Sequence, residues 1–144
     1  MHYEGELTFV VEDGRFAAVG FGLDLTKRAL QDRLKSRGLP WERSKAFDGS
    51  ALFSEFVALP ERLGSLSLQL DVDGETRQRG GVELMMYKPP AILRELQSFT
   101  TLEDGDLIMT GTPAGVGTIR TGERFEARVL AGDELLVAAT WVAQ

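Results

Sequence analysis

The amino-acid sequence predicts a mainly β fold of the α+β class with two short helices. Runs of β-branched and aromatic residues recur along the chain, two Asp-Gly pairs separate neighbouring runs, and only two stretches have the spacing of a helix. With 144 residues, of which 43% are hydrophobic, the chain is long enough for one packed core and too short for two. We therefore expect a single domain over residues 1–144.

The first two runs are expected to form a hairpin. Residues 2–11 and 15–23 are rich in aromatic and β-branched residues. Asp13-Gly14 between them is typical of a tight hairpin turn. Pairing through this turn places Asp24 at the end of the returning strand, opposite roughly residue 3.

Two helices and several further strands complete the expected fold. The first helix is predicted over residues 27–37, with Thr26 as its N-terminal cap. Pro89 and Pro90 suit the first turn of the second helix, which is expected to run to about Gln97. The other predicted strands are 51–59, 66–72, a short strand after the Asp73-Gly74 turn, 106–109, 123–130 and 134–142. An aperiodic loop is expected at 39–50 and a glycine-rich loop at 110–117.

The bulk composition excludes several classes of site. The chain has no cysteine and only one histidine, which rules out disulfides, thiolate zinc sites and multi-histidine metal sites. A formal charge of -6 argues against nucleic acid or an anionic membrane surface as the partner. No apolar run approaches the roughly 20 residues that span a bilayer. A cytoplasmic enzyme or binding domain fits these properties.

A pair of glutamates is the first candidate for a metal site. Glu4 and Glu6 are two residues apart on a predicted strand, so their side chains point to the same face, which they share with His2. Two close carboxylates repel each other unless a cation lies between them or one keeps its proton. Carboxylate oxygens favour Mg²⁺, Mn²⁺ or Ca²⁺. The alternative is an ordinary solvated strand face.

Asp24 is the candidate for a third ligand, because hairpin pairing brings it near the two glutamates. An aspartate just before a helix can equally be an N-terminal cap. Arg28 and Gln31 are three residues apart on the expected helix and would flank Asp24. Lys45 lies in the aperiodic loop near aromatic residues, where it could hold a substrate oxyanion or be a solvated loop lysine.

The glycine-rich loop TGTPAGVG (110–117) offers backbone N–H groups and two hydroxyls, which suit a carboxylate or a phosphate. It lacks the Gly-Lys-Ser/Thr ending of a nucleotide-binding P-loop. The alternative is a strand connection that happens to be rich in glycine.

The ordered segments resemble the fumarylacetoacetate hydrolase family, in particular the single-domain branch that acts on acylpyruvates and oxaloacetate. The likeness covers nearly the whole chain. The matching segments are HYEGEL (2–7), GFGLDLTKRALQ (20–31), KSRGLPWERSKAFDG (35–49), DGETRQ (73–78) and LEDGDLIMTGTPAGVG (102–117).

The resemblance implies a role for individual residues. Glu4, Glu6 and Asp24 match the three metal carboxylates of the family, and Lys45 matches its active-site lysine. The substrate-binding residues of this branch match Arg28, Gln31, Lys45 and Thr112. The implied fold is a mixed β-roll or β-sandwich with short helices, the implied partner a second copy of the chain, and the implied cofactor Mg²⁺ or Mn²⁺.

The resemblance also implies the reaction. A 2,4-dioxo acid would lose its acyl group by C–C hydrolysis, or oxaloacetate would lose CO₂, through an enolate stabilised by the cation and Lys45. An isomerase or tautomerase at the same site is the first alternative, and a non-catalytic metal-binding or dimerisation module is the second. Relatives of this branch carry an N-terminal segment with a water-activating His-Glu pair, which we expect to be absent from residues 1–144.

Overall fold

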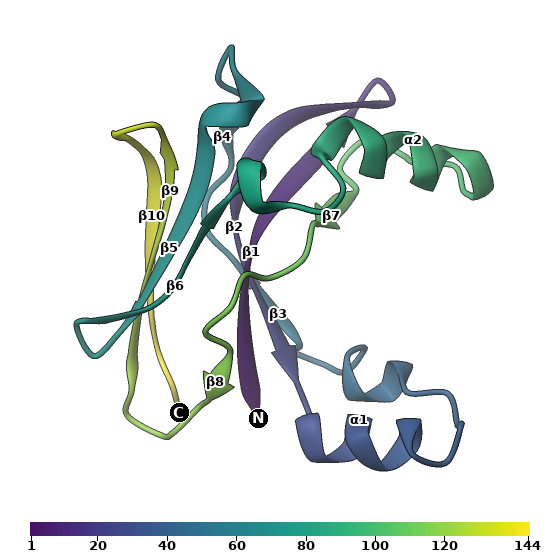
Figure 1. Ribbon diagram of the computed structural model, residues 1–144, viewed down its shortest axis with the longest axis vertical. Helices are drawn as coiled ribbons and strands as arrows, with labels where there is room; N and C mark the ends of the chain where they lie inside the picture. The colour runs from purple at the N-terminus through teal and green to yellow at the C-terminus, as the bar shows by residue number, and fades with distance from the viewer.

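The computed structural model describes all 144 residues, which form two antiparallel β-sheets with two α-helices at the edges (Figure 1). The first sheet has the strand order β3-β2-β1-β7, with β4 also paired to β2 and β8 to β1. The second sheet has the order β10-β9-β5-β6. The mainly β prediction is confirmed.

The bounds of the elements are as follows. The first sheet contains β1 (His2–Glu12), β2 (Arg15–Thr26), β3 (Ala51–Phe53), β4 (Val57–Ala58), β7 (Leu107–Met109) and β8 (Gly117–Thr118). The second contains β5 (Leu66–Val72), β6 (Glu75–Gly81), β9 (Arg124–Ala131) and β10 (Glu134–Val142). The helices are α1 (Arg28–Lys35) and α2 (Pro89–Phe99), with 3-10 turns η1 (Glu42–Ser44), η2 (Leu63–Ser65) and η3 (Val82–Leu84).

The hairpin of β1 and β2 is the centre of the first sheet. Asp13 and Gly14 form its turn with positive φ angles of 50° and 68°, which matches the right-handed twist of the two strands. β2 extends to Thr26, three residues beyond the predicted end, so Asp24 lies inside the strand. Its partner is Glu4, one residue from the expected position.

The two helices begin close to their predicted positions. α2 begins with two prolines, as predicted, and ends at Phe99. α1 begins at Arg28, and the prediction that Thr26 caps it is wrong, because the capping position is Lys27 and no side chain caps the helix. Thr26 is the last residue of β2 and is fully buried. Neither helix is long and apolar enough to cross a membrane.

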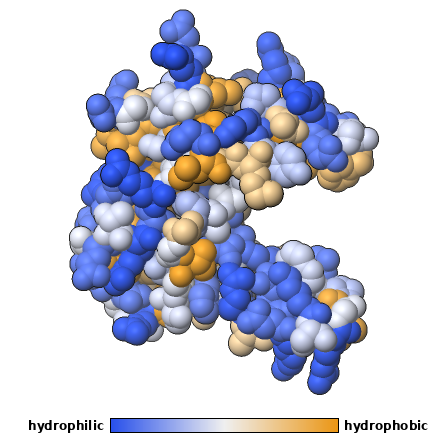
Figure 2. Space-filling view, viewed as in Figure 1, coloured by the Kyte–Doolittle hydropathy of each residue, from blue (hydrophilic) through white to orange (hydrophobic).

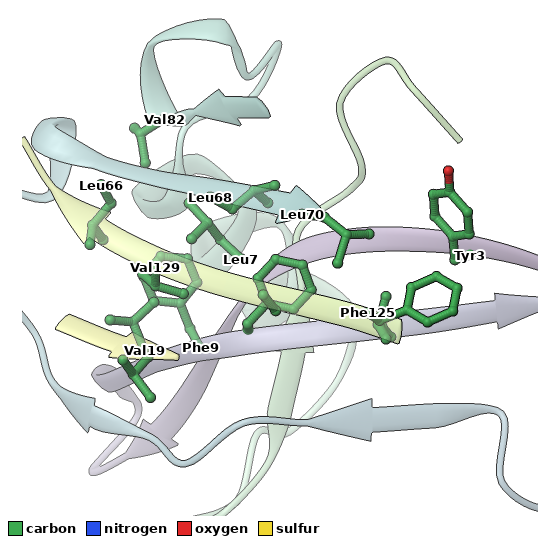
Figure 3. Close-up of a cluster of buried hydrophobic side chains, with 14 of the residues drawn as sticks. Tyr3, Leu7, Phe9, Val19, Leu66, Leu68, Leu70, Val82, Phe125 and Val129 are labelled. Carbon is green, nitrogen blue, oxygen red and sulfur yellow. The ribbon is translucent and has the colours of Figure 1, made fainter. Parts of the chain in front are cut away.

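The hydrophobic core lies between the two sheets (Figure 3). Leu7 and Phe9 of β1 and Val19 of β2 are completely buried and meet Leu68 of β5 and Val129 of β9. Because side chains alternate along a strand, the odd-numbered residues of β1 fill this core. The even-numbered residues of β1, from Glu4 to Thr8, therefore face the other side of the first sheet.

Two expected elements differ in detail from the structure. The predicted strand 51–59 is divided into β3 and β4, because the hydroxyl of Ser54 accepts a hydrogen bond from Phe21 N–H (2.8 Å) and donates one to Glu55 O (2.7 Å). The glycine-rich loop passes alongside β1, and its end pairs with β1 as β8. The first difference places the segment around Ser54 against β2, and the second places the glycine-rich loop along β1.

Candidate metal centre

Three carboxylates converge on the first sheet. Glu4 and Glu6 point to the same face of β1, and Asp24 of β2 lies directly opposite Glu4. One carboxylate oxygen from each of the three lies within 4.8 Å of the others. Glu4 and Glu6 are 8% and 5% exposed, and Asp24 is half-buried. The strand spacing and the hairpin thus produce the cluster that the sequence predicted.

The ammonium group of Lys45 lies against this cluster. Its Nζ donates hydrogen bonds to Glu4 Oε2 (2.8 Å), Asp24 Oδ2 (2.6 Å) and the hydroxyl of Thr26 (2.6 Å). The loop that carries Lys45 is tied to the end of β2 by the bond from Lys27 N–H to Ser44 O (3.0 Å). Burial alone would lower the pKa of Lys45, but the bonds to Asp24 and Glu4 outweigh it and raise the pKa.

The first turn of α1 supplies the second cation. Arg28 forms an ion pair with Glu4 Oε1, and its Nη1 donates to Gln31 Oε1 (2.6 Å). Gln31 is 3% exposed and is the buried residue of this helix. Arg28 thus reaches the carboxylate cluster at Glu4, which Lys45 also contacts, and Gln31 is joined to the cluster through Arg28.

Glu6 has no basic partner of its own. It accepts a hydrogen bond from Gly111 N–H (2.6 Å), in the glycine-rich loop. Burial raises the pKa of Glu6 to about 7; the Gly111 bond opposes this rise, and the charges of Asp24 and Glu4 add to it. Burial would also raise the pKa of Glu4, but Lys45 and Arg28 lower it. Lys45 and Arg28 form ion pairs with Glu4 and Asp24, whereas no basic side chain forms one with Glu6.

The chemistry of these donors fits a hard divalent cation. All three groups offer oxygen atoms, they lie close enough to share one ion, and the buried Glu6 would ionise fully once a cation balanced its charge. Thr8, the next residue on this face of β1, is completely buried and its hydroxyl has no hydrogen-bond partner. This face of β1 is thus polar, and the Thr8 hydroxyl on it lacks a hydrogen-bond partner.

Thr112 lies beside the two glutamates, in the glycine-rich loop. Its hydroxyl donates to Gly5 O (2.9 Å), in the peptide between Glu4 and Glu6, and accepts from Gln78 Nε2 (2.7 Å). Gln78 of β6 is 1% exposed. Sequence reasoning gave no role to Gln78, and it did not predict that Gly111 N–H would bind Glu6 or that the Thr26 hydroxyl would bind Lys45. Only the position of Gln78 at the end of the DGETRQ segment pointed to it.

A hollow opens beside these elements, between the lobe of α2 and the lobe of α1 and η1 (Figure 2). On the α2 side, residues Thr110 to Pro113 form one wall of a cavity of about 550 Å³. No charged side chain lines this cavity. Three residues of its lining are strongly exposed: Leu84 (69%), Met86 (90%) and Tyr87 (69%). The rim of the hollow is therefore apolar on this side.

The sequence and the fold of this chain are similar to those of known proteins. Oxaloacetate tautomerase YcgM of Escherichia coli (strain K12) is 38% identical over 139 residues, which is 87% of this chain and 64% of that protein. The yeast protein ynq8, a fumarylacetoacetate hydrolase family protein, superposes with a TM-score of 0.90 at 30% identity, over 99% of this chain and 67% of that one.

A third relative was crystallised with ligands. Fumarylpyruvate hydrolase from Pseudomonas aeruginosa, in complex with Mn²⁺ and pyruvate, has a TM-score of 0.84 at 32% identity, over 99% of this chain and 66% of that one. The chain spans between about half and two thirds of the length of the curated relatives it matches. Residues 1–142 match the fumarylacetoacetate (FAA) hydrolase C-terminal family. The chain belongs to the fumarylacetoacetate hydrolase family.

Proposed function

We propose that this chain provides the cation-binding centre of an enzyme that acts on a 2-oxo acid. The observation that carries the proposal is the convergence of Glu4, Glu6 and Asp24, whose carboxylate oxygens lie within 4.8 Å of one another, with the ammonium group of Lys45 bonded to two of them. The three carboxylates would hold Mg²⁺ or Mn²⁺, or Ca²⁺ in vitro. The Mn²⁺ and pyruvate bound to the Pseudomonas aeruginosa relative support both the ion and the class of substrate.

The side chains have distinct tasks in this proposal. When bound, the cation supplies Lewis-acid stabilisation of negative charge on substrate oxygens. Lys45 adds a positive charge that is in place before the charge on the substrate develops. Arg28 and Gln31, already joined to each other, would orient the substrate carboxylate. Thr112 would join them by redirecting its hydroxyl proton from Gly5 O.

Enol–keto tautomerisation of oxaloacetate is the reaction that we place first. It moves one proton between the enol oxygen and C3 and consumes no water, so it requires no water-activating base. The Escherichia coli relative is named an oxaloacetate tautomerase. The positive charge of Lys45, together with that of a bound cation, would stabilise the enolate while the proton is transferred.

C–C hydrolysis of an acylpyruvate, or decarboxylation of oxaloacetate, is the second candidate. The relative from Pseudomonas aeruginosa, a fumarylpyruvate hydrolase, supports hydrolysis. Hydrolysis also requires a base that activates water. Lys45 is engaged with two carboxylates and a hydroxyl, so it is not free to take this role as it lies.

One set of assays separates the candidates. Enolic oxaloacetate is followed by its ultraviolet absorbance, pyruvate release is followed by a coupled dehydrogenase, and acetylpyruvate cleavage is followed by loss of its own absorbance. We expect Mn²⁺-dependent acceleration of the first signal. Accelerated pyruvate release or acetylpyruvate cleavage would favour the second candidate. Absence of all three activities in protein shown to bind Mn²⁺ would reject catalysis by this chain and leave the binding-module alternative.

The ligand assignment has its own test, calorimetric titration with Mn²⁺. Glu4→Gln, Glu6→Gln and Asp24→Asn each remove one ligand charge, and we expect each to weaken Mn²⁺ binding at least 100-fold. Glu12→Gln is the matched control, because Glu12 belongs to the same strand and is exposed. An unchanged affinity in any of the three variants would remove that residue from the site.

A homodimer is the assembly that we propose, as the family resemblance implies. The exposed apolar side chains of Leu84, Met86 and Tyr87 support self-association, because large apolar groups that cluster at a surface are typical of contact sites. Light scattering after size-exclusion chromatography is expected to give a mass of about twice 15.8 kDa. A monomeric mass at all concentrations would reject the dimer without affecting the metal assignment.

A further inference from the structure

We propose that Gln78 is a positioning residue that fixes the glycine-rich loop against the strand of the metal ligands. The inference rests on the proposed function, since it concerns the same centre. Gln78 belongs to β6 of the second sheet, whereas Glu4 and Glu6 belong to β1 of the first. Its side chain therefore connects two parts of the fold that the backbone pairing does not connect.

The side-chain amide of Gln78 makes three hydrogen bonds, which together we call the Gln78 bridge. Its Oε1 accepts from Gly5 N–H (2.8 Å), and its Nε2 donates to the Thr112 hydroxyl (2.7 Å) and to Pro113 O (2.9 Å). The Thr112 hydroxyl closes the circuit by donating to Gly5 O (2.9 Å). Gly5 lies between Glu4 and Glu6 on β1. This network satisfies both of its backbone polar groups, the N–H and the C=O.

The orientation of the amide is fixed by its partners. Gly5 N–H requires an acceptor and Pro113 C=O requires a donor, so turning the amide over would oppose like groups at both ends. A glutamate could satisfy Gly5 N–H but would repel Pro113 O. An apolar side chain would leave Gly5 N–H and Pro113 O unpaired at a position where Gln78 is only 1% exposed. Glutamine is the side chain that matches this pair of opposite requirements.

The loop is also fitted to β6 sterically. A Cβ atom added at Gly115 would lie 1.8 Å from Arg77 O and 3.2 Å from Gln78 Cγ. At Gly80, an added Cβ would lie 2.8 Å from Pro113 Cβ. The loop thus rests directly on β6 on both sides of Gln78, and small shifts there would move Thr112 and Gly111 together.

These two loop residues contact the strand of the metal ligands at Glu6 and at Gly5. Gly111 N–H donates to the Glu6 carboxylate, and the Thr112 hydroxyl holds the Gly5 peptide. Gln78 touches neither a carboxylate of the cluster nor the side where a substrate would meet it. It acts through Gly5 and Thr112, and it sets the distance between the ligand strand and the loop.

The test uses a double-mutant cycle of three variants and one matched control variant. Gln78→Met removes the bridge while keeping an unbranched side chain of similar length. Gln69→Met is the matched control, because Gln69 lies on the neighbouring strand β5 and makes its hydrogen bonds to Asp71 and Thr76, outside the centre. Thr112→Val removes the hydroxyl alone, and the double variant Gln78→Met/Thr112→Val completes the cycle. Circular dichroism and thermal unfolding establish that each variant folds.

The main readout is binding of oxalate, a small planar dianion, to the Mn²⁺-loaded protein. We expect Gln78→Met to weaken oxalate binding at least tenfold and Gln69→Met to weaken it less than twofold. In the Thr112→Val background, Gln78→Met should weaken it by less than a further twofold. Equal effects of Gln78→Met and Gln69→Met, or additive effects of Gln78→Met and Thr112→Val, would overturn the proposal.

A readout without metal keeps the inference separate from the proposed function. In the metal-free protein, amide hydrogen exchange at Gly5 should be at least tenfold faster in Gln78→Met than in the wild type or in Gln69→Met. Unchanged exchange at Gly5 would refute the bridge. If the wild type bound no Mn²⁺, the proposed function would fail, and exchange at Gly5 alone would decide whether Gln78 holds the strand.

Discussion

Glu4 and Asp24 face each other across the β1–β2 pair, and the ammonium group of Lys45 donates a hydrogen bond to each of them. The lysine thus neutralises part of the charge that a divalent cation would neutralise. Arg28 does the same on the other oxygen of Glu4. Lys45 and Arg28 therefore balance charge on Glu4 and Asp24 but not on Glu6, and a cation that binds there competes with these two side chains.

Replacement of Lys45 should separate cation binding from catalysis. Lys45→Met removes a positive charge from two of the three ligands, so we expect Mn²⁺ to bind at least tenfold more tightly. The same change removes a charge that stabilises the developing enolate, so turnover of oxaloacetate should fall at least 100-fold. Calorimetry and the enol assay measure the two effects independently.

Lys35→Met is the control for this prediction, because Lys35 lies over the ring of Trp41 and not in the cluster. It should change neither the Mn²⁺ affinity nor the turnover by more than about twofold. Weaker Mn²⁺ binding in Lys45→Met would show that Lys45 supports the ligands and does not compete with the cation.

The raised pKa of Glu6 predicts a pH dependence of stability in the metal-free protein. Below about pH 4.5, the ordinary pKa, this carboxyl is protonated in both the folded and the unfolded chain. Between pH 4.5 and about 7 the folded chain keeps the proton that the unfolded chain has released, so a rise in pH favours unfolding. Glu6 should therefore lower the free energy of unfolding by about 3 kcal/mol across this window.

Urea unfolding at pH 5 and pH 8 in the presence of a chelator measures this effect. Glu6→Gln should lose less free energy of unfolding between the two pH values than the wild type does, and Glu12→Gln should behave as the wild type. Saturating Mn²⁺ should abolish the wild-type loss, because the ionised carboxylate is then balanced. The same pH dependence in the wild type and in Glu6→Gln would show that Glu6 ionises normally in the folded chain.

The ligand cluster and the hairpin could be predicted from the sequence because both follow from short-range rules. Asp13-Gly14 determines the turn, and the two-residue period of a strand puts Glu4 and Glu6 on one face. The wrong prediction for Thr26 also came from a short-range rule. A threonine just before a helix is a good N-terminal cap by local rules. In the structure, however, the Thr26 hydroxyl accepts a hydrogen bond from Lys45, 19 positions away, and Thr26 belongs to β2.

The contacts that join distant segments could not be predicted in this way. Gln78 meets Gly5 across 73 residues and Thr112 across 34, and the contact depends on how the two sheets pack. The glycine-rich loop gave no sign of the residue on which it rests. DGETRQ was one of the five segments that together carried the family resemblance. The reason for its final glutamine emerges only from the structure, where β6 lies beside the loop.

An uneven charge distribution predicts that salt will slow the reaction. Segment 27–45, which includes α1 and η1, carries seven basic and two acidic side chains, so its formal charge is +5 and that of the remaining chain is -11. Figure 2 shows the lobe of this segment as mostly hydrophilic. Because Lys45 and Arg28 of the centre belong to it, its field should attract an anionic oxo acid.

We expect kcat/KM for oxaloacetate to fall several-fold between low salt and about 0.3 M salt, with kcat nearly constant. The triple variant Arg33→Gln/Lys35→Gln/Arg37→Gln should lower kcat/KM several-fold at low salt and remove most of the salt dependence. The control Arg62→Gln/Arg94→Gln/Arg120→Gln makes the same change of net charge outside the segment. Equal effects of the two triple variants would assign the attraction to net charge and not to this lobe.

Close packing of the glycine-rich loop on β6 predicts that Gly115 tolerates no side chain. Gly115 has a φ angle of 105°, and a Cβ there would lie 1.8 Å from Arg77 O, a backbone atom that cannot turn aside. Gly122 is a matched control, because its φ angle is 91° but a Cβ there would meet nothing within 4 Å. Gly122→Ala therefore measures the backbone strain alone, about 1–2 kcal/mol.

Gly115→Ala should lower the free energy of unfolding by at least about 2 kcal/mol more than Gly122→Ala, because the loop must move away from β6. The displaced loop carries Gly111 and Thr112, so Mn²⁺-dependent oxalate binding should also weaken at least tenfold in Gly115→Ala and remain unchanged in Gly122→Ala. Urea unfolding and calorimetry measure the two effects. Equal losses of free energy of unfolding in Gly115→Ala and Gly122→Ala would show that the loop can move away from Arg77 without destabilising the fold. The close contact would then have no part in holding the centre.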